Sequence, residues 1–266
     1  MTTTNGACTV CGGTGWKPAS AEATAGRPAG PEASRGVVRC DCMAQASFDR
    51  RWRAARIPAR YQHCDFSSFQ ANVHDEPAWN QSLSAARVQA EAFGRDFLPG
   101  RTEFGLLFMG PSGVGKTHLA VAVLRGLLER GTEVLFCDFR ELLKTIQDSY
   151  NPVNQATEMQ VLSPVLESEV LLLDDLGASK PSAWVQDTVA HIINTRYNDR
   201  RVTLITTNYL DAPATRAVGS GSVREDTLAD RIGERMRSRL YEMCRVIEMR
   251  AEDFRRRVKQ AQYHLR

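Results

Sequence analysis

A glycine-rich octapeptide has the residue types and the spacing that hold a triphosphate. It matches the pattern G-x-x-x-x-G-K-[ST] at every required position, with the residues Gly110, Pro111, Ser112, Gly113, Val114, Gly115, Lys116 and Thr117. Glycines let the backbone point its N–H groups at a phosphate, and a following helix adds a favourable dipole. In such a P-loop Lys116 reaches the β- and γ-phosphates and Thr117 ligates Mg²⁺; we count His118, the next residue, with the same binding loop. The octapeptide therefore predicts binding of a nucleoside triphosphate with magnesium.

Two adjacent carboxylates follow a second apolar run. The run 171–173 is Leu-Leu-Leu, and Asp174 and Asp175 come directly after it. A buried parallel strand delivers such groups at its carboxyl end, where ligands bind in open α/β sheets. We expect Asp174 to support Mg²⁺ through its water shell and Asp175 to orient or deprotonate the attacking water. The alternative is a strand that ends in a helix-capping aspartate, but the P-loop upstream favours a Walker B strand.

A polar tip and an arginine-rich segment complete the residues that could act on a phosphate. The apolar run 202–207 ends in Asn208, whose amide could bind the γ-phosphate or the catalytic water, although a Thr-Asn pair after a strand is more often a turn. One predicted helix further on carries the four arginines Arg231, Arg235, Arg237 and Arg239. Such a helix is usually a solvated face, yet an arginine donated by a neighbouring subunit can raise phosphoryl transfer by ~10³ or more.

Four of the seven cysteines crowd the first 42 residues, at Cys8, Cys11, Cys40 and Cys42. Structural zinc takes four thiolates from two tight turns, so this cluster predicts a closed zinc site. The second pair is one residue shorter than the common C-x-x-C, and free thiols or a redox pair are the alternatives.

The elements that must position these residues alternate along the chain. The run 104–109 reads as a buried strand before the P-loop, and residues from 117 open an amphipathic helix, so the glycines are more than an ordinary turn. Further apolar runs at 133–138, 170–175, 202–207 and 245–249 are separated by helical patterns. Short strands separated by helices predict a mostly parallel sheet covered on both faces, an α/β nucleotide-binding domain.

Composition sets the domain plan. With 266 residues and 42% hydrophobic content the chain can bury a large core, and its net charge of +3 neither demands nor excludes nucleic acid. The start lacks the basic and apolar regions of a signal peptide, and no apolar run would span a bilayer, so we expect a cytoplasmic protein with no membrane partner. We expect a cysteine-rich module at 1–50 with a mobile insert, a linker at 51–78 and an ATPase domain at 79–266.

Taken together, the motifs resemble the AAA+ helicase-loader family that includes DnaC, DnaI and the transposition helper IstB. The resemblance rests on G-P-S-G-V-G-K-T, L-L-L-D-D-L-G, L-I-T-T-N, and R-M-R-S-R-L followed by a strand and D-F-R, and it covers about residues 56–257. It implies an AAA+ core without a C-terminal helical lid, since only 17 residues follow position 249. Arg255 would then stand in part for the arginine that a lid carries.

The resemblance also implies particular roles. Arg239 would be the arginine finger and Asn208 the first sensor; an insertion at about 140–159 would line a surface for single-stranded DNA; and Tyr61, with Phe66 as a second nominee, would contact the adenine. The function implied is an ATPase that binds ATP and Mg²⁺, forms ATP-dependent homo-oligomers and loads a DnaB-type replicative helicase onto single-stranded DNA, docking it through the cysteine module.

Two other functions stay open at this stage. An IstB-like helper that acts on double-stranded DNA with a transposase would carry the same core motifs. A small-molecule P-loop kinase is disfavoured, because it would need a substrate lid and would not need Asp175, Asn208 and Arg239 together.

Overall fold

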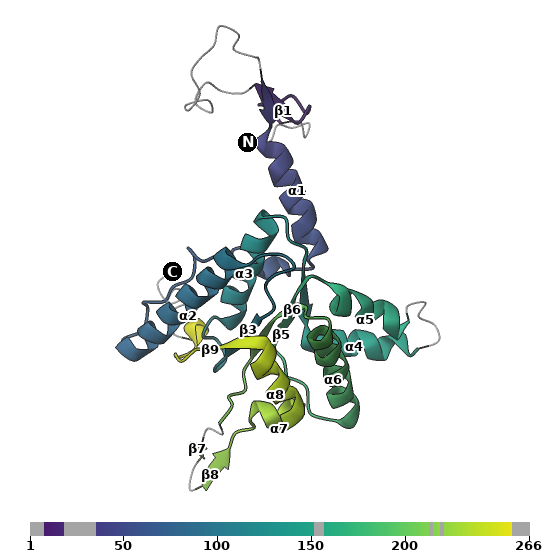
Figure 1. Ribbon diagram of the computed structural model, residues 1–266. Coiled ribbons are helices and arrows are strands. Elements are labelled where there is room, and N and C mark those ends of the chain that lie inside the picture. Colours follow the sequence, from purple (N-terminus) through teal and green to yellow (C-terminus); the bar gives the residue numbers. More distant parts are fainter. Residues whose placement is uncertain (1–7, 19–35, 152–156, 213–214, 219–220, 257–266) are drawn as a thin grey trace. The chain divides into compact units, whose positions relative to one another are not determined.

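The computed structural model describes residues 8–18, 36–151, 157–212, 215–218 and 221–256 (Figure 1). The chain divides into two compact units, 1–53 and 54–266. In the first, strands β1 (Trp16–Pro18) and β2 (Val37–Arg39) pair antiparallel and helix α1 (Asp41–Ala54) follows. No helix in the described parts of the chain is both long and apolar enough to cross a bilayer.

The second unit is built on a five-stranded parallel sheet of order β4-β5-β6-β3-β9. Its strands are β3 (Gly105–Met109), β4 (Val134–Asp138), β5 (Val170–Asp174), β6 (Val202–Thr207) and β9 (Cys244–Glu248). The P-loop strand β3 lies between β6 and β9, so three motif-bearing strands, β5, β6 and β3, are consecutive in the sheet. Their carboxyl ends meet at one edge, where ligands bind in such sheets.

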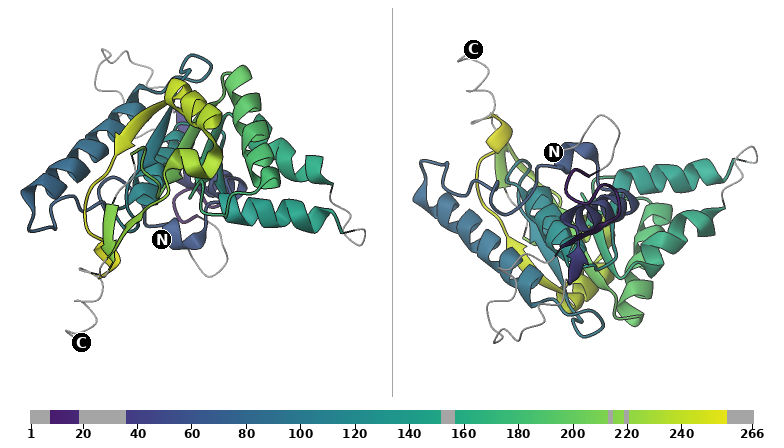
Figure 2. Two further views of the ribbon diagram at one scale, coloured as in Figure 1. Left: turned by 90° about the horizontal axis from the view of Figure 1, so that it is seen from below. Right: turned by 90° about the horizontal axis from the view of Figure 1, so that it is seen from above.

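Helices cover both faces of this sheet (Figures 1 and 2). Successive strand residues point to opposite faces. Leu107, Leu171 and Ile205 therefore share one apolar core with residues of α4 to α8. Helix α3 packs on the sheet and against α2. The helices are α2 (Pro77–Asp96), α3 (Lys116–Glu129), α4 (Phe139–Ser149), α5 (Glu158–Glu167), α6 (Ala183–Asn198), α7 (Leu228–Ile232) and α8 (Glu234–Met243).

Two local differences from the sequence expectations have clear causes. The one helix expected to carry Arg231 and Arg239 is two helices, because Gly233 adopts φ 85°, a conformation that favours glycine and ends α7. The hairpin of β7 (Thr215–Val218) and β8 (Gly221–Arg224) precedes α7 and had no counterpart in the expected plan.

Residues 54–78, expected as a linker, belong to the second unit and supply part of its core. Ala55, Cys64 and Phe69 are buried there, and a short helical turn runs over Ala59–Tyr61. This stretch passes directly beside the P-loop, since the Phe69 ring packs against Gly115. Part of the nucleotide pocket is therefore formed from it.

Candidate active site

The P-loop takes its shape from glycines that have no room for a side chain. Gly115 caps α3 in the left-handed region at φ 97°, and a Cβ there would lie 2.6 Å from the Phe69 ring. At Gly113, with φ 81°, a Cβ would lie 1.9 Å from the Asp253 carboxylate. A side chain at either position would therefore both strain the backbone and displace a neighbour.

Lys116 is held inside this loop by three oxygen atoms. Its Nζ donates to the carbonyls of Gly110 at 2.8 Å and Pro111 at 2.7 Å, and to Asn208 Oδ1 at 2.7 Å. Asn208 in turn donates from Nδ2 to Asp175 Oδ1 at 2.6 Å. One amide therefore connects the phosphate-binding ammonium to the carboxylate expected to activate water, as a sensor of the γ-phosphate would require.

This environment predicts that nucleotide binding depends on pH. Burial lowers the pKa of Lys116 to about 8, against the opposing effect of Asp175 and Asp174. The phosphates of ATP favour the charged ammonium, so above pH 8 binding must take up a proton. We expect the Kd for ATP·Mg to be insensitive to this group below pH 8 and to weaken by up to about tenfold per pH unit above it.

Isothermal titration in buffers of different ionisation enthalpy measures that proton uptake directly. Lys116→Arg is the matched control, because a guanidinium stays charged throughout this range. A Kd that stays constant from pH 7.5 to 9.5 in the unmodified protein would contradict the assignment.

The end of β5 brings the magnesium candidates together. Thr117 Oγ1 donates to Asp174 Oδ1 at 2.8 Å, and Thr206 Oγ1 donates to the same oxygen at 2.6 Å. Asp174 is 4% exposed, and burial raises the pKa of its carboxyl. Thr117 and Asp174 are thus placed as an Mg²⁺ site requires, with a hydroxyl and a carboxylate oxygen in contact.

Asp175 has an unusual backbone conformation. Its φ is 57°, a left-handed conformation that few residues other than glycine adopt. The hydroxyl of Thr206 accepts its N–H at 2.9 Å, and the Thr206 carbonyl accepts the N–H of Leu176 at 2.8 Å. Strand β6 thereby holds the turn of the chain at Asp175. The sequence marks Thr206 only as part of a polar tip and gives it no role.

A cavity of about 720 Å³ surrounds these groups. Its lining includes P-loop residues 112–117, Asp174, Asp175 and Asn208 from the ends of β5 and β6, and Tyr61 and His118. The predicted P-loop residues Gly110 and Pro111 do not line it. The Tyr61 ring lies 5.7 Å from the ring of Phe136 and beneath Arg60, at 4.7 Å. Phe66, the other nominee for the adenine, does not line the cavity.

Two further parts of the cavity lining were not fully predicted from the sequence. Asp138 was not predicted, and of the C-terminal segment only Arg255 was. Asp138 ends β4 directly opposite Asp174 in the parallel register, and its Oδ1 caps α4 by accepting the N–H groups of Arg140 and Glu141. Phe254 and Arg255 enter from the C-terminal segment, where the Phe254 N–H donates to the Gly113 carbonyl at 3.2 Å. Only tertiary folding brings position 255 to the P-loop.

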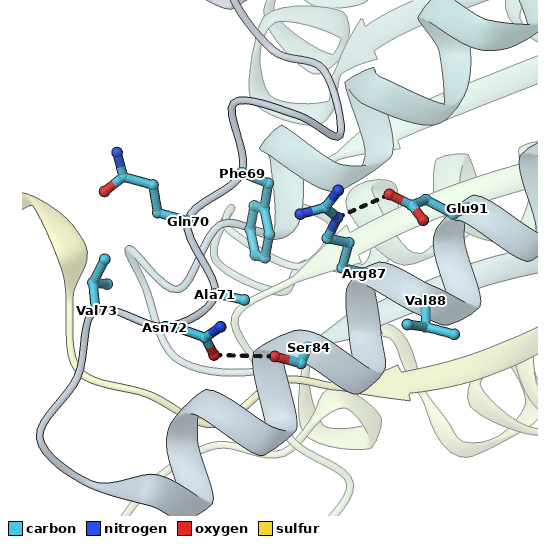
Figure 3. A pocket seen from close by; sticks show the side chains of 9 residues that line it. All are labelled: Phe69, Gln70, Ala71, Asn72, Val73, Ser84, Arg87, Val88 and Glu91. Carbon is cyan, nitrogen blue, oxygen red and sulfur yellow. Dashed lines mark hydrogen bonds and ion pairs between the residues drawn. The ribbon is translucent and has the colours of Figure 1, made fainter.

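A second hollow of about 520 Å³ lies between α2 and residues 69–73 (Figure 3). Its charged residues, Arg87 and Glu91, pair with each other at 2.8 Å across one turn of α2. It shares Phe69 with the nucleotide cavity but holds none of the predicted site residues. It is therefore not the hollow in which the predicted site residues meet.

Arg231 is engaged inside its own subunit. It is 8% exposed, donates from Nε to the Gly177 carbonyl at 2.7 Å and from Nη2 to the Ser179 carbonyl at 2.6 Å, and pairs with Asp226 at 3.1 Å. Its guanidinium also lies over the Tyr209 ring at 4.7 Å. This arginine fixes the loop that follows the Walker B strand.

The arginines of α8 differ in their engagement. Arg237 pairs with the carboxylate of Asp211, which holds it in place. Arg235 is exposed, and Arg239 lies over the Tyr197 ring at 5.4 Å without an ion pair to a carboxylate of the described chain. No arginine of α8 is among the residues that line the nucleotide cavity. A finger on this helix would therefore act on another subunit's nucleotide.

The insertion predicted at about 140–159 covers nearly all of α4 and the first residues of α5, and 152–156 lie outside the described residues. Helices α4 and α5 lie side by side (Figure 2). At the end of α4, the Tyr150 hydroxyl lies 3.3 Å from Trp184 Nε1, and Tyr150 and Met159 are exposed. Tyr150 is thus the exposed aromatic residue that the described part of the insertion offers, and a base could stack on its ring.

The four N-terminal cysteines come together as metal ligands would. Their sulfur atoms all lie within 4.8 Å of one another, with Cys8 and Cys40 at 3.8 Å and Cys11 and Cys42 at 3.4 Å. The Gly15 N–H donates to the Cys11 sulfur at 3.3 Å and lowers the pKa of that thiol to about 6. Four thiols at this spacing fit tetrahedral zinc, which would be structural because no position is left open.

Removing one of these ligands is expected to unfold the first unit alone. In the described part of this unit, two three-residue strands and one helix bury little apolar surface, so the metal would supply much of the unit's stability. We expect Cys11→Ser to lose about one zinc per chain and to become protease-sensitive within residues 1–53, with ATP binding unchanged. Zinc analysis with limited proteolysis measures this, and Cys137→Ser is the control; equal zinc content in both variants would refute the site.

The sheet order, the P-loop and the Walker B carboxylates define a P-loop nucleotide-binding core of the AAA+ type. The chain belongs to the family of IstB-like ATP binding proteins, whose model matches residues 44–262.

Known relatives agree with this placement. The replicative helicase loader DnaC of Escherichia coli (strain K12) is 25% identical over 173 residues, which are 65% of this chain and 66%, just under two thirds, of that protein. A crystal structure of the DnaC helicase loader superposes with a TM-score of 0.57 at 30% identity, over 73% of this chain and 100% of that one. A DnaI crystal structure gives a TM-score of 0.55 at 24% identity over 73% and 95%, a likeness of fold.

Proposed function

We propose that this protein is an ATP-dependent loader of a replicative helicase. The observation that carries the proposal is the Lys116–Asn208–Asp175 chain of hydrogen bonds, which connects the phosphate-binding lysine to the water-activating carboxylate. Such a chain responds to the presence of a γ-phosphate, so it suits an ATPase that switches between two states. The 30% identity to the DnaC helicase loader structure supports the biological setting.

In this proposal each part of the molecule has one task. ATP and Mg²⁺ bind at the P-loop and Asp174, and Arg239 of a neighbouring subunit completes the site in a homo-oligomer. The α4–α5 pair grips single-stranded DNA, and the cysteine unit with its zinc docks a DnaB-type helicase. Tyr61 lies in the cavity as a contact for the adenine.

A loading assay tests the nucleotide switch. Helicase, single-stranded DNA and the protein are mixed with ATP, and loaded helicase is counted after a salt wash. We expect Lys116→Ala to abolish ATP-dependent loading, and Arg101→Ala, an exposed change outside the cavity, to load as the unmodified protein does. Equal loading by Lys116→Ala and the unmodified protein would refute the switch.

The family description favours one second candidate, a helper ATPase for transposition. It would assemble on double-stranded DNA in the presence of ATP and stimulate a transposase. Electron microscopy with duplex and single-stranded DNA separates the two, because filaments or rings that form only on duplex would favour the helper.

A further inference from the structure

A second set of soft and borderline metal ligands lies in the second unit, beside the P-loop. The side chains of His63, Cys64 and His118 each offer one ligand atom, and these atoms lie within 4.8 Å of one another. His63 Nε2 is 3.9 Å from Cys64 Sγ, and the rings of His63 and His118 meet edge to face at 5.9 Å between centroids. Separations of this size suit ligands that share one tetrahedral ion.

The local fold fixes these residues independently of any metal. Cys64 is 2% exposed, and its carbonyl accepts a hydrogen bond from Arg125 Nε of α3 at 3.1 Å. His118 Nε2 lies 2.9 Å from the Asp65 carbonyl, and the Phe69 ring packs edge-on against its imidazole at 5.4 Å. A carbonyl only accepts, so Nε2 carries the hydrogen and the lone pair of the neutral ring is on Nδ1. Metal-ligating histidines are commonly held in this way by a backbone carbonyl.

We propose that His63, Cys64 and His118 bind a transition-metal ion of the thiolate- and imidazole-preferring class, with Zn²⁺ as the first choice. One thiolate and two imidazoles form a ligand set that zinc uses, whereas Mg²⁺ and Ca²⁺ take oxygen ligands. Three protein ligands leave a fourth position for water. The site is separate from the Mg²⁺ site, which has only oxygen donors.

A metal ion at this position would connect residues 63–64 to the first turn of α3. His63 and Cys64 come from the segment after Ala59–Tyr61, and His118 directly follows Thr117. All three ligands line the nucleotide cavity. Bound metal would therefore fix one wall of that cavity, so its occupancy and ATP affinity should influence each other.

Cobalt binding by the full-length chain tests the site. The metal-free protein is titrated with Co²⁺, and the thiolate charge-transfer and visible bands are recorded together with the bound metal per chain. We expect His63→Ala and Cys64→Ser each to bind one ion fewer than the unmodified protein, whatever the four-cysteine cluster binds. Cys137→Ser, which removes another thiol of the same unit, should bind as the unmodified protein does.

His63 is exposed, so its replacement leaves the core intact and isolates the metal effect from folding. Alkylation gives a second readout: Zn²⁺ should slow the reaction of Cys64 with iodoacetamide in the unmodified protein, and much less in His63→Ala. Equal metal content in the unmodified protein and in both ligand variants, with no protection of Cys64, would overturn the proposal.

Discussion

Replacing Asp175 by asparagine is expected to reduce ATP turnover by about 10³-fold while ATP·Mg still binds. The carboxylate is the group placed to orient or deprotonate the attacking water, and the amide cannot take that proton. The residues expected to hold the phosphates and Mg²⁺ keep their own partners after this change, since Lys116 donates to the Pro111 carbonyl and Thr117 donates to Asp174.

The local geometry lets this substitution change the chemistry without changing the backbone. Asp175 has φ 57°, and asparagine is among the few residues that tolerate this conformation. The carbonyl oxygen of the substituted amide can still accept from Asn208 Nδ2, which donates to the Asp175 carboxylate at 2.6 Å. The backbone N–H at this position can still donate to Thr206. Charge and basicity are therefore lost without loss of the turn.

Steady-state phosphate release and equilibrium binding of a fluorescent ATP analogue measure the two halves of this prediction. Asp187→Asn, an exposed change on α6, is the matched control and should turn over normally. If Asp175→Asn keeps full turnover, another residue activates the water. If the variant loses ATP binding, Asp175 contributes to binding of ATP and not to the chemical step.

The sequence predicted the site best where polar residues directly follow a predicted strand. Parallel strands put their carboxyl ends at one edge, so the P-loop, Asp174 and Asn208 could be expected to lie close together. The hydrogen bond from Lys116 to Asn208 is a finding of the structure. Thr206 could not be assigned a role in this way, because its contact with Asp174 depends on the register of β6 against β5.

Other features depend on contacts distant in sequence. The packing of Asp253 against Gly113 joins residues 140 positions apart, and no local signal announces it. The sequence analysis also missed the start of α1 at Asp41. The cysteine spacing predicts a tight turn at Cys42, but in the structure Cys42 lies in the first turn of this helix. The start of α5, by contrast, has a local sequence signal, the capping box of Thr157 and Gln160. The sequence analysis did not use this signal, because it assigned these positions to the end of an insertion.

The arginine finger gives the other large expected effect: Arg239→Ala should lower ATP turnover by about 10³-fold in the assembled protein. Arg231 and Arg237 are already engaged by partners within their own subunit. Arg239 lies over the Tyr197 ring, which orients its guanidinium without neutralising it. Arg235→Ala, one turn away on the same helix, is the matched control, and its ATP turnover should stay within about twofold of that of the unmodified protein.

Mixing two inactive variants tests whether the arginine acts between subunits. A protomer with Arg239→Ala keeps an intact P-loop, and a protomer with Lys116→Ala keeps its arginine. In a mixed assembly the second can complete the nucleotide site of the first, so turnover should reappear on mixing and rise with total protein concentration. No residue of α8 lines the nucleotide cavity of its own subunit, which favours action on a neighbour. An arginine that acts within one subunit would instead give no recovery of turnover at any mixing ratio.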